Sequence, residues 1–261
     1  IAEQQRLIEL LQEKRQAVIS HAVTKGLNAN APMKDSGVEW LGEVPEHWQT
    51  QRLKNLFSLK HGYAFDGNRF SEEGKFALMT PGNFKETGGF RRKEPEKFYT
   101  GEDFPDDFIL KTGQLLVVMT EQAPGLLGTS LVVPDNQCYL HNQRLGLVTG
   151  LNEEALDKDF LYWLTNSLVM KAKVGVTATG QKVRHTSPQK ILELEVCLPP
   201  LVEQMLIAKT LSDSGERFEM LTATARDAIK LLSERRSALI SAAVTRQIDV
   251  RGLVEAEAGE Q

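Results

Sequence analysis

The sequence predicts an α+β protein in which one globular domain of mixed helices and strands is flanked by two long helices. An internal repeat indicates the helices: residues 1–28 align without a gap with residues 222–249, at a constant offset of 221, and twelve positions are identical. Apolar residues of the second copy recur at spacings of three and four, the heptad pattern of a two-helix contact. Between the copies, short apolar runs separated by Gly, Pro and Asn indicate strands.

The first helix is expected over residues 1–26. Neither a capping residue nor an initiator Met precedes it, so we expect the chain to be cut from a longer one within this helix. Gly26 is placed to end the helix, because glycine accepts the left-handed conformation that closes many helices. The expected contact stripe of this helix consists of Gln4, Leu7, Leu11, Lys14, Val18 and His21.

Residues 27–50 are expected to form an irregular connector, because two prolines within them exclude a continuous helix. Trp40, Leu41 and Trp48 supply large apolar side chains. We expect these three residues to pack the connector onto the domain that follows.

The globular domain is expected over residues 51–200. Apolar runs and helical periodicity define its regular elements. They are the strands Leu115–Met119, Ser130–Val133, Leu145–Val148 and Val196–Leu198, one helix over Asp159–Lys173, and a short helix that Ser187 and Pro188 open and that ends near Leu192.

The second long helix is expected over residues 201–250, followed by a tail of residues 251–261. A break is expected near Ser212–Gly215, where glycine and two serines lower helix propensity. Lys14 and Arg235 each occupy one core-facing position of their helix, where a long side chain can extend its charge outward. The stripe of the second helix consists of Phe218, Leu221, Ala225, Ala228, Leu232, Arg235, Leu239 and Ala242.

The composition is that of a soluble globular protein, with 41% hydrophobic and 25% charged residues among 261. No apolar run approaches the roughly 18 residues of a membrane span, and no signal-peptide pattern is present. Cys138 and Cys197 stand apart, without metal or redox spacing. We therefore expect buried, inert thiols in a reducing, cytoplasmic setting.

The net charge of −4 conceals a basic segment. Residues 166–190 contain no Asp or Glu, and a second basic point is the run Arg91-Arg92-Lys93. A local basic stripe governs contact with a polyanion more than the overall sum does, so the composition allows a nucleic-acid partner. The cations of the basic segment are Lys171, Lys173, Lys182, Arg184 and Lys190.

Enzyme motifs are missing from the sequence, and we expect no catalysis by this chain. No G-x-G-x-x-G follows a predicted strand. The Gly62–Gly67 spacing continues with Asn68-Arg69, where a phosphate-binding loop needs Lys-Ser or Lys-Thr. The five histidines are scattered without metal-ligand spacing. We therefore expect no metal site and no bound cofactor.

The strongest nucleic-acid candidate is the segment Thr179-Gly180-Gln181-Lys182-Val183-Arg184-His185. Glycine permits close approach of the backbone to a phosphate, lysine and arginine neutralise it, and glutamine can pair with adenine. The alternative is a solvated basic loop without a ligand. If Arg184 reads a base edge, its replacement by alanine should relax specificity at a cost of about 1–3 kcal/mol.

A second candidate region begins with the loop Met119–Ser130, for which a tight β-connection is the alternative. Tyr63 and Phe65 are expected in the core rather than stacked on bases. Arg91, Arg92 and Lys93 could equally form an exposed hairpin tip. The remaining candidates for DNA contact are Asn142, Gln143, Arg144, Arg91, Arg92, Lys171 and Lys173.

Together these features resemble the specificity subunit of type I restriction–modification systems. The segment LIELLQEKRQAVISHAVTKGL (7–27) is similar to the end of the family's central conserved helix, and KDSGVEWLGEVPEHW (34–48) to the lead-in of a second target recognition domain. TGQKVRH (179–185) with LPPLVEQ (198–204) resembles the exit of that domain. LLSERRSALISAAVTRQIDVR (231–251) resembles the C-terminal ending, so the resemblance covers nearly the whole chain.

The resemblance implies the C-terminal half of such a subunit, with one target recognition domain between helices that pair as an antiparallel coiled coil. It implies sequence-specific binding of double-stranded DNA at a half-site, docking to methyltransferase and restriction–translocase subunits, and a homodimer of two half-length chains. S-adenosylmethionine, ATP and Mg would belong to the partner subunits. The helix interface would consist of Leu7, Leu11, Val18, Leu221, Ala228, Leu232 and Leu239.

Two alternatives stay open at this point. One is a helical assembly or inhibitor module that binds the modification subunits without reading DNA, which the acid-free segment 166–190 argues against. The other is a recognition domain fused to a catalytic domain encoded upstream.

Overall fold

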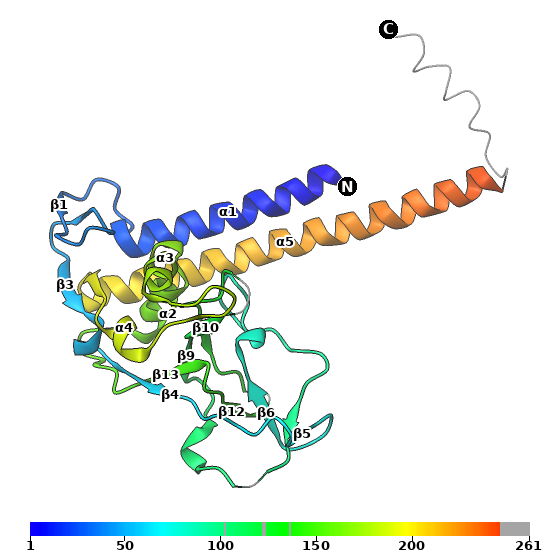
Figure 1. Ribbon diagram of the computed structural model, residues 1–261. Helices are drawn as coiled ribbons and strands as arrows, with labels where there is room; N and C mark the ends of the chain where they lie inside the picture. Colours follow the sequence, from blue (N-terminus) through cyan, green and yellow to red (C-terminus); the bar gives the residue numbers. More distant parts are fainter. Residues whose placement is uncertain (102, 122–123, 136, 246–261) are drawn as a thin grey trace. The chain divides into compact units, whose positions relative to one another are not determined.

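The computed structural model describes residues 1–101, 103–121, 124–135 and 137–245 (Figure 1). The chain divides into two compact units: Gln16–Ser212 forms one, and Ile1–Arg15 with the segment from Asp213 onward forms the other. Two helices, α1 (Ala2–Lys25) and α5 (Leu201–Val244), contribute to both units. Among the described residues, no helix is long and apolar enough to cross a membrane.

Both long helices that the repeat predicts are present, but the predicted end of the second helix at 246–250 and the predicted tail of 251–261 lie outside the described residues. Gly26 follows α1 with a φ of 75°, and its N–H donates to the Ala22 carbonyl at 3.1 Å, which confirms the predicted helix end. The predicted break near Ser212–Gly215 is wrong, because α5 continues through it for 44 residues. Gly215 is buried. A helical glycine costs only about 1 kcal/mol relative to alanine, which a buried close contact can offset.

The buried stripes of the unit that contains Ile1–Arg15 differ in part from the predicted ones. Ile8 is half-buried where Leu7 was expected, because the adjacent apolar residues Leu7 and Ile8 fit two neighbouring helix faces equally well. Lys14 and Arg235 are exposed. Of the predicted interface residues, Leu11, Val18 and Ala228 are half-buried, whereas Leu7, Leu221, Leu232 and Leu239 are exposed in the single chain.

The connector folds onto the domain as predicted. It forms the hairpin of β1 (Met33–Asp35) and β2 (Glu43–Pro45). Trp48 is fully buried, and Trp40 and Leu41 pack against the same core. The predicted packing of the connector onto the globular domain that follows it is therefore confirmed.

Two sheets form the body of the domain. A four-stranded antiparallel sheet has the order β11-β9-β13-β4, and a five-stranded sheet has the order β5-β7-β6-β12-β8, with β12 parallel to β6. The strands are β4 (Ser58–His61), β5 (Phe70–Ser71), β6 (Phe76–Met79), β7 (Phe98–Tyr99), β8 (Ile109–Leu110), β9 (Leu115–Val118), β11 (Ser130–Val132), β12 (Cys138–His141) and β13 (Leu145–Thr149).

Two short strand pairs lie outside these sheets. They join segments far apart in the chain: β3 (Gln49–Arg52) pairs with β15 (Glu195–Leu198), and β10 (Thr120–Glu121) pairs with β14 (Arg184–His185). The predicted strands at 115–119, 130–133, 145–148 and 196–198 are confirmed as β9, β11, β13 and β15. In the described part of the chain, short 3-10 helices cover Leu53–Asn55, Pro81–Asn83 and Asp106–Phe108.

The predicted helix over Asp159–Lys173 is two helices, α2 (Lys158–Asn166) and α3 (Leu168–Thr177). Ser167 separates them with an extended backbone, and its Oγ accepts the Met170 N–H at 3.2 Å. A serine that caps a new helix competes with helix continuation, which the apolar periodicity alone did not show. The short helix α4 (Pro188–Leu192), capped by Ser187, is confirmed.

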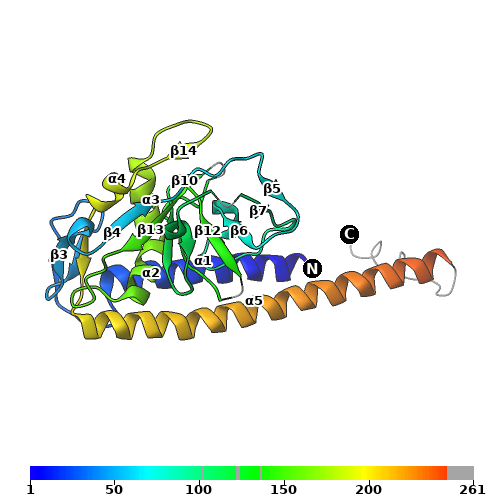
Figure 2. The ribbon, with the colours of Figure 1, turned by 90° about the horizontal axis from the view of Figure 1, so that it is seen from below.

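The main core lies where the end of α1, helix α2 and the start of α5 meet (Figures 1 and 2). Ile19 of α1, Phe160 of α2 and Ile207 of α5 all belong to it. Gln204 of α5 joins this core to the chain before α2, since its amide group accepts the Asp157 N–H at 2.9 Å and donates to the Ala155 carbonyl at 2.8 Å. The end of α1 and the start of α5 are thus part of the domain's own core.

The cysteines differ from each other. Cys197 is buried, as predicted, and burial raises the pKa of its thiol. Cys138 is exposed, which contradicts the predicted burial, because it is the first residue of β12. Phe65 is buried in an aromatic cluster and Tyr63 stacks edge-on against it with ring centroids 5.0 Å apart, so their core role is confirmed.

Candidate nucleic-acid interface

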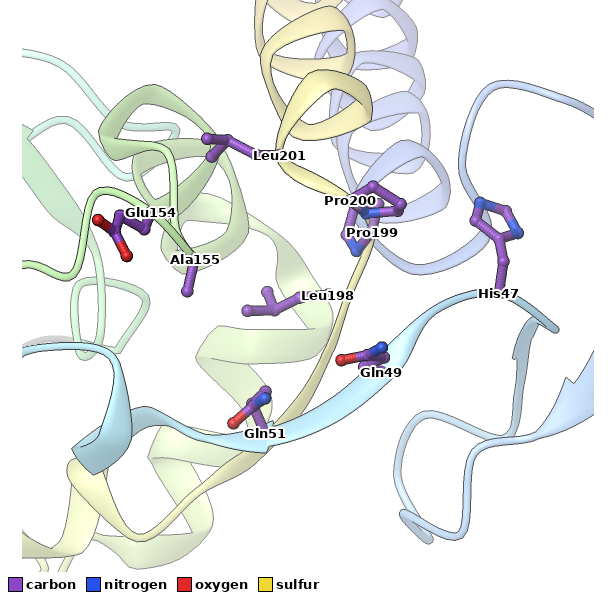
Figure 3. A pocket seen from close by; sticks show the side chains of 9 residues that line it. All are labelled: His47, Gln49, Gln51, Glu154, Ala155, Leu198, Pro199, Pro200 and Leu201. Carbon is purple, nitrogen blue, oxygen red and sulfur yellow. The ribbon is translucent and has the colours of Figure 1, made fainter.

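One pocket, of about 300 Å³, lies where β3, β15 and the start of α5 meet (Figure 3). Among the described residues, its lining offers no Lys or Arg to a polyanion. The lining consists of His47, Gln49, Gln51, Glu154, Ala155, Leu198, Pro199, Pro200 and Leu201. The pocket is therefore a poor candidate for nucleic-acid contact.

The predicted basic segment forms a hairpin over residues 179–185. Thr179 and His185 exchange two backbone hydrogen bonds of 2.9 Å, and β14 pairs with β10 beside them. Gly180 has a φ of 101°, and a Cβ there would lie 2.1 Å from the Val183 carbonyl oxygen. Only glycine fits this turn without strain. The turn leaves Gln181 and Lys182 exposed at the hairpin tip.

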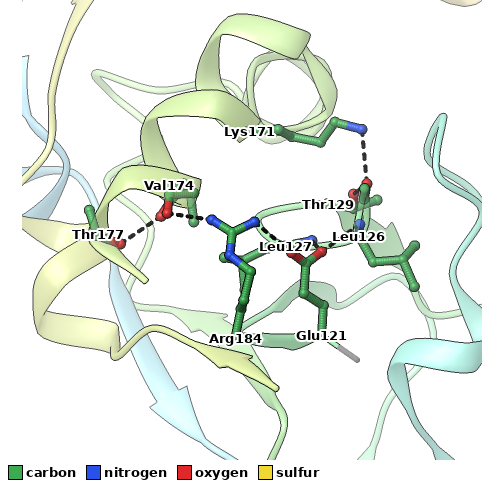
Figure 4. A network of polar contacts seen from close by, with 10 residues as sticks. Glu121, Leu126, Leu127, Thr129, Lys171, Val174, Thr177 and Arg184 are labelled. Atoms are coloured by element: carbon green, nitrogen blue, oxygen red, sulfur yellow. Dashed lines mark hydrogen bonds and ion pairs between the residues drawn. The ribbon is translucent and has the colours of Figure 1, made fainter. Parts of the chain in front are cut away.

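Arg184 of this hairpin points inward. Its Nη1 donates to Oε1 of Glu121 at 2.9 Å, and its Nη2 donates to the Gly175 carbonyl at 2.7 Å (Figure 4). The Glu121 side chain is only 2% exposed, whereas the Arg184 side chain is 38% exposed. The guanidinium predicted to touch DNA is thus engaged by a buried carboxylate of its own chain.

Glu121 also holds the loop that follows β10. Its Oε2 accepts the N–H groups of Leu126 at 3.0 Å and Leu127 at 2.8 Å, so one carboxylate joins this loop to the hairpin (Figure 4). Sequence reasoning placed Glu121 within a candidate loop but gave it no role. Glu121 closely follows a strand of apolar residues, and this position indicated that its side chain is buried. A buried carboxylate needs hydrogen-bond partners, so the sequence did contain a signal for this role.

Lys171 of α3 joins a third segment to this network. Its Nζ donates to the Glu86 carbonyl at 2.6 Å and to the Gly125 carbonyl at 3.4 Å. Figure 4 shows Lys171 within this network. Burial lowers the pKa of its ammonium group. Lys171 therefore positions two loops, and its charge is only partly available to a ligand.

The Asn142-Gln143-Arg144 run lies next to the hairpin. The Met119 N–H donates to the Arg144 carbonyl at 2.9 Å, and the Met119 carbonyl accepts the Thr186 N–H at 2.9 Å. The Arg144 side chain is exposed, but Asn142 is buried and its Oδ1 accepts the Arg144 N–H. Among the described residues, Oε1 of Gln143 is buried without a hydrogen-bond partner. The structure thus brings two of the predicted regions together.

The remaining predicted cations lie on other segments. Arg91 donates to the Gly82 carbonyl at 3.4 Å, and Arg92 forms an ion pair with Glu96 at 3.1 Å. Lys173 is half-buried and lines a hollow that also contains Trp40. No hydrogen bond between the described residues links Arg91, Arg92 or Lys173 to the hairpin. His185 contacts the Thr120 hydroxyl through Nδ1 at 2.7 Å.

A buried histidine next to this region was not recognised in the sequence. His141 is fully buried, its Nε2 donates to the Leu145 carbonyl at 3.0 Å, and its Nδ1 has no partner among the described residues. Burial lowers the pKa of His141 to about 4 from 6.5. The imidazole is therefore neutral in the folded chain at neutral pH.

This burial predicts a loss of stability in mild acid. Below pH 6.5 the unfolded chain protonates His141 while the folded chain does not, so the free energy of unfolding should fall as pH drops from 6.5 towards 4. The total loss should be about 3 kcal/mol. Urea unfolding between pH 7.5 and 4.5 measures it. His141→Leu should flatten this part of the pH profile, and an unchanged profile in that variant would contradict the prediction.

Comparisons with known proteins agree on one family. The model of the family described as the type I restriction modification DNA specificity domain matches residues 45–231. The chain is 24% identical over 221 residues to the type I restriction enzyme MjaVIII specificity subunit, and 23% identical over 220 residues to the putative MjaX specificity subunit, both from Methanocaldococcus jannaschii. Each match covers 82% of this chain but 49% and 46% of the relatives, so the chain spans about half their length.

Solved structures show the same fold. A chain from a structure of complex assembly and conformational transition in the type I R-M system has a TM-score of 0.62 at 15% identity, with coverage of 92% of this chain and 54% of that one. The HsdS subunit from Thermoanaerobacter tengcongensis has a TM-score of 0.56 at 16% identity, with 92% and 53% covered. The S subunit from M. genitalium has a TM-score of 0.52 at 21% identity, with 84% and 49% covered.

Proposed function

Because the chain belongs to the family of type I restriction–modification DNA specificity domains, we propose that it reads one half of a bipartite DNA site and leaves catalysis to partner subunits. The observation that supports this most directly is the hairpin over residues 179–185, which presents Gln181 and Lys182 to solvent on a turn fixed by Gly180 and Glu121.

The residues of the interface take distinct roles in this proposal. Gln181 reads an adenine edge in the major groove, because its amide can donate and accept at once. Lys182 and Arg144 are exposed and contact phosphates or guanine edges. Arg184 and Lys171 hold the loops that carry these side chains, and they act as positioning residues.

The partners follow from the same family. We propose that the helices dock methyltransferase and restriction–translocase subunits in the cytoplasm, and that S-adenosylmethionine, ATP and Mg bind those subunits. Exposed apolar side chains on α5, among them Met205, Leu206 and Leu231, support a docking role. Since the chain spans about half the length of its curated relatives, two copies in a homodimer would supply the two half-site readers.

Two single variants at the hairpin tip test the proposal. In the complex with a methyltransferase subunit, Lys182→Ala should weaken binding to specific and random duplexes alike and lower the salt slope by about one. Gln181→Ala should cost about 1–3 kcal/mol at one base position and leave random DNA unaffected. Both side chains are exposed, so urea unfolding should show no change in either variant. Full binding by both variants would place DNA contact elsewhere.

One observation is also compatible with the alternative function, an assembly or inhibitor module. Of the five cations in the acid-free segment, Lys171, Arg184 and Lys190 donate hydrogen bonds to groups of the same chain. An assembly or inhibitor module that binds modification subunits without DNA does not need these cations to be free for phosphate contacts. A gel-shift titration at low salt with random duplex decides, because the rival predicts no shift even when the methyltransferase subunit is present.

A further inference from the structure

An exposed valine lies in the turn of the hairpin over residues 179–185. Val183 is 45% exposed, and it follows the exposed polar residues Gln181 and Lys182. Turns favour Gly, Asn, Asp, Ser and Pro, and a β-branched apolar residue is an unusual choice for one. Val183 belongs to none of the hydrophobic clusters that the described residues form in the core. Its two methyl groups are therefore available to a ligand.

The backbone that carries Val183 is held on both sides. Its carbonyl oxygen lies so close to Gly180 that a Cβ there would be 2.1 Å away. The next residue, Arg184, is held by its ion pair with the buried Glu121 carboxylate and by the pairing of β14 with β10. Valine itself is stiff at χ1. A ligand that contacts these methyl groups would therefore immobilise little that is free beforehand.

Apolar contact is one of the ways in which a side chain distinguishes bases in the major groove. The apolar group that base edges present there is the C5-methyl group of thymine, which cytosine lacks. Glutamine and lysine recognise bases through hydrogen bonds, and a methyl group offers them neither a donor nor an acceptor. A valine close to an adenine reader thus supplies the contact that the polar side chains of this turn cannot make.

We propose that Val183 is a specificity-determining residue that contacts the C5-methyl group of a thymine in the DNA half-site. This rests on the proposed function, in which Gln181 reads an adenine, and it adds a second base contact from the same turn. Because only Lys182 separates the two residues, the chain between them spans at most about 7 Å. Successive base pairs are about 3.4 Å apart, so the thymine lies in the base pair of that adenine or within about two pairs of it.

The test changes single methyl groups of the DNA. The full chain, in complex with a methyltransferase subunit, first selects its preferred duplex from a random library. Each thymine of that duplex is then replaced in turn by deoxyuridine, which lacks only the C5-methyl group. At one thymine, within about two pairs of the adenine that Gln181→Ala ceases to discriminate, the affinity of the wild type should fall about fourfold, the factor for one buried methyl group. Val183→Ala should bind the thymine duplex more weakly by a similar factor and should be indifferent to this replacement.

Val176→Ala is the matched control, because Val176 is an exposed valine of α3 outside the hairpin. This variant should keep the affinity of the wild type and the full effect of deoxyuridine. Neither valine variant should lower the urea midpoint, since both side chains are exposed.

Two results would overturn the assignment of Val183. One is that no deoxyuridine replacement weakens binding by the wild type, which requires no variant to fold. The other is that Val183→Ala keeps the full effect of deoxyuridine. In both cases Gln181→Ala still reports whether the hairpin reads DNA, so the proposed function can stand. A complex that selects no preferred duplex would overturn the proposed function together with this assignment.

Discussion

Arg184→Ala is expected to destabilise the chain by about 2–4 kcal/mol and to weaken binding to all DNA sequences, rather than to relax the reading of one base. The Glu121 carboxylate is 2% exposed, and among the described residues its remaining partners would be the N–H groups of Leu126 and Leu127. A buried charge without its counterion is costly. The loss of stability should lie towards the lower end of this range, because the Arg184 side chain is partly exposed and water can replace some of its contacts with Glu121.

The measurement is urea unfolding of Arg184→Ala beside Lys182→Ala, which removes an exposed cation from the same hairpin. Only Arg184→Ala should lower the midpoint. The double variant Glu121→Gln with Arg184→Gln should recover part of the loss, because it removes both charges of the pair. Normal stability of Arg184→Ala together with lost discrimination at one base pair would instead make Arg184 a base reader, as the sequence suggested.

Trp48→Ala is expected to cost about 3–5 kcal/mol of unfolding free energy. Trp48 is fully buried, its Nε1 donates to Oε1 of Glu203 at 3.2 Å, and its ring lies 3.5 Å from the position that a Cβ on Gly26 would take. The one indole therefore contacts the end of α1 and the start of α5. Its loss should loosen both helix ends and leave a cavity between them.

Thermal and urea unfolding measure this effect, and Trp40→Ala is the matched control. Trp40 belongs to the same connector but is only partly buried, so its removal should cost clearly less. Trp48→Phe separates the ring from its N–H and should recover most of the stability. Equal losses for Trp40→Ala and Trp48→Ala would contradict the central position assigned to Trp48.

The local elements were predictable because their causes are local. The apolar runs around Leu116, Leu131 and Leu147 predicted strands, and the Ser187 cap with Pro188 predicted a short helix. Gly26 marked the end of the first helix through its own conformational freedom. The family was also recognisable, because its motifs are spread over nearly the whole chain.

Contacts between distant segments could not be predicted in this way. The sequence gives no sign that Arg184 meets a carboxylate 63 residues away, or that Asn142, a predicted DNA contact, is buried. The Ser167 cap that divides α2 from α3 was hidden by apolar periodicity on both of its sides.

The sequence by itself determined the two long helices, the short helix after Ser187, four of the strands, the repeat and the family, because propensity, side-chain periodicity and motif depend on neighbouring residues. Only the tertiary structure decided which cations stay free to meet DNA and which are held by groups of the same chain. Both depend on burial and on ion pairing between segments far apart in the chain, and these energies exist only after folding brings the segments together.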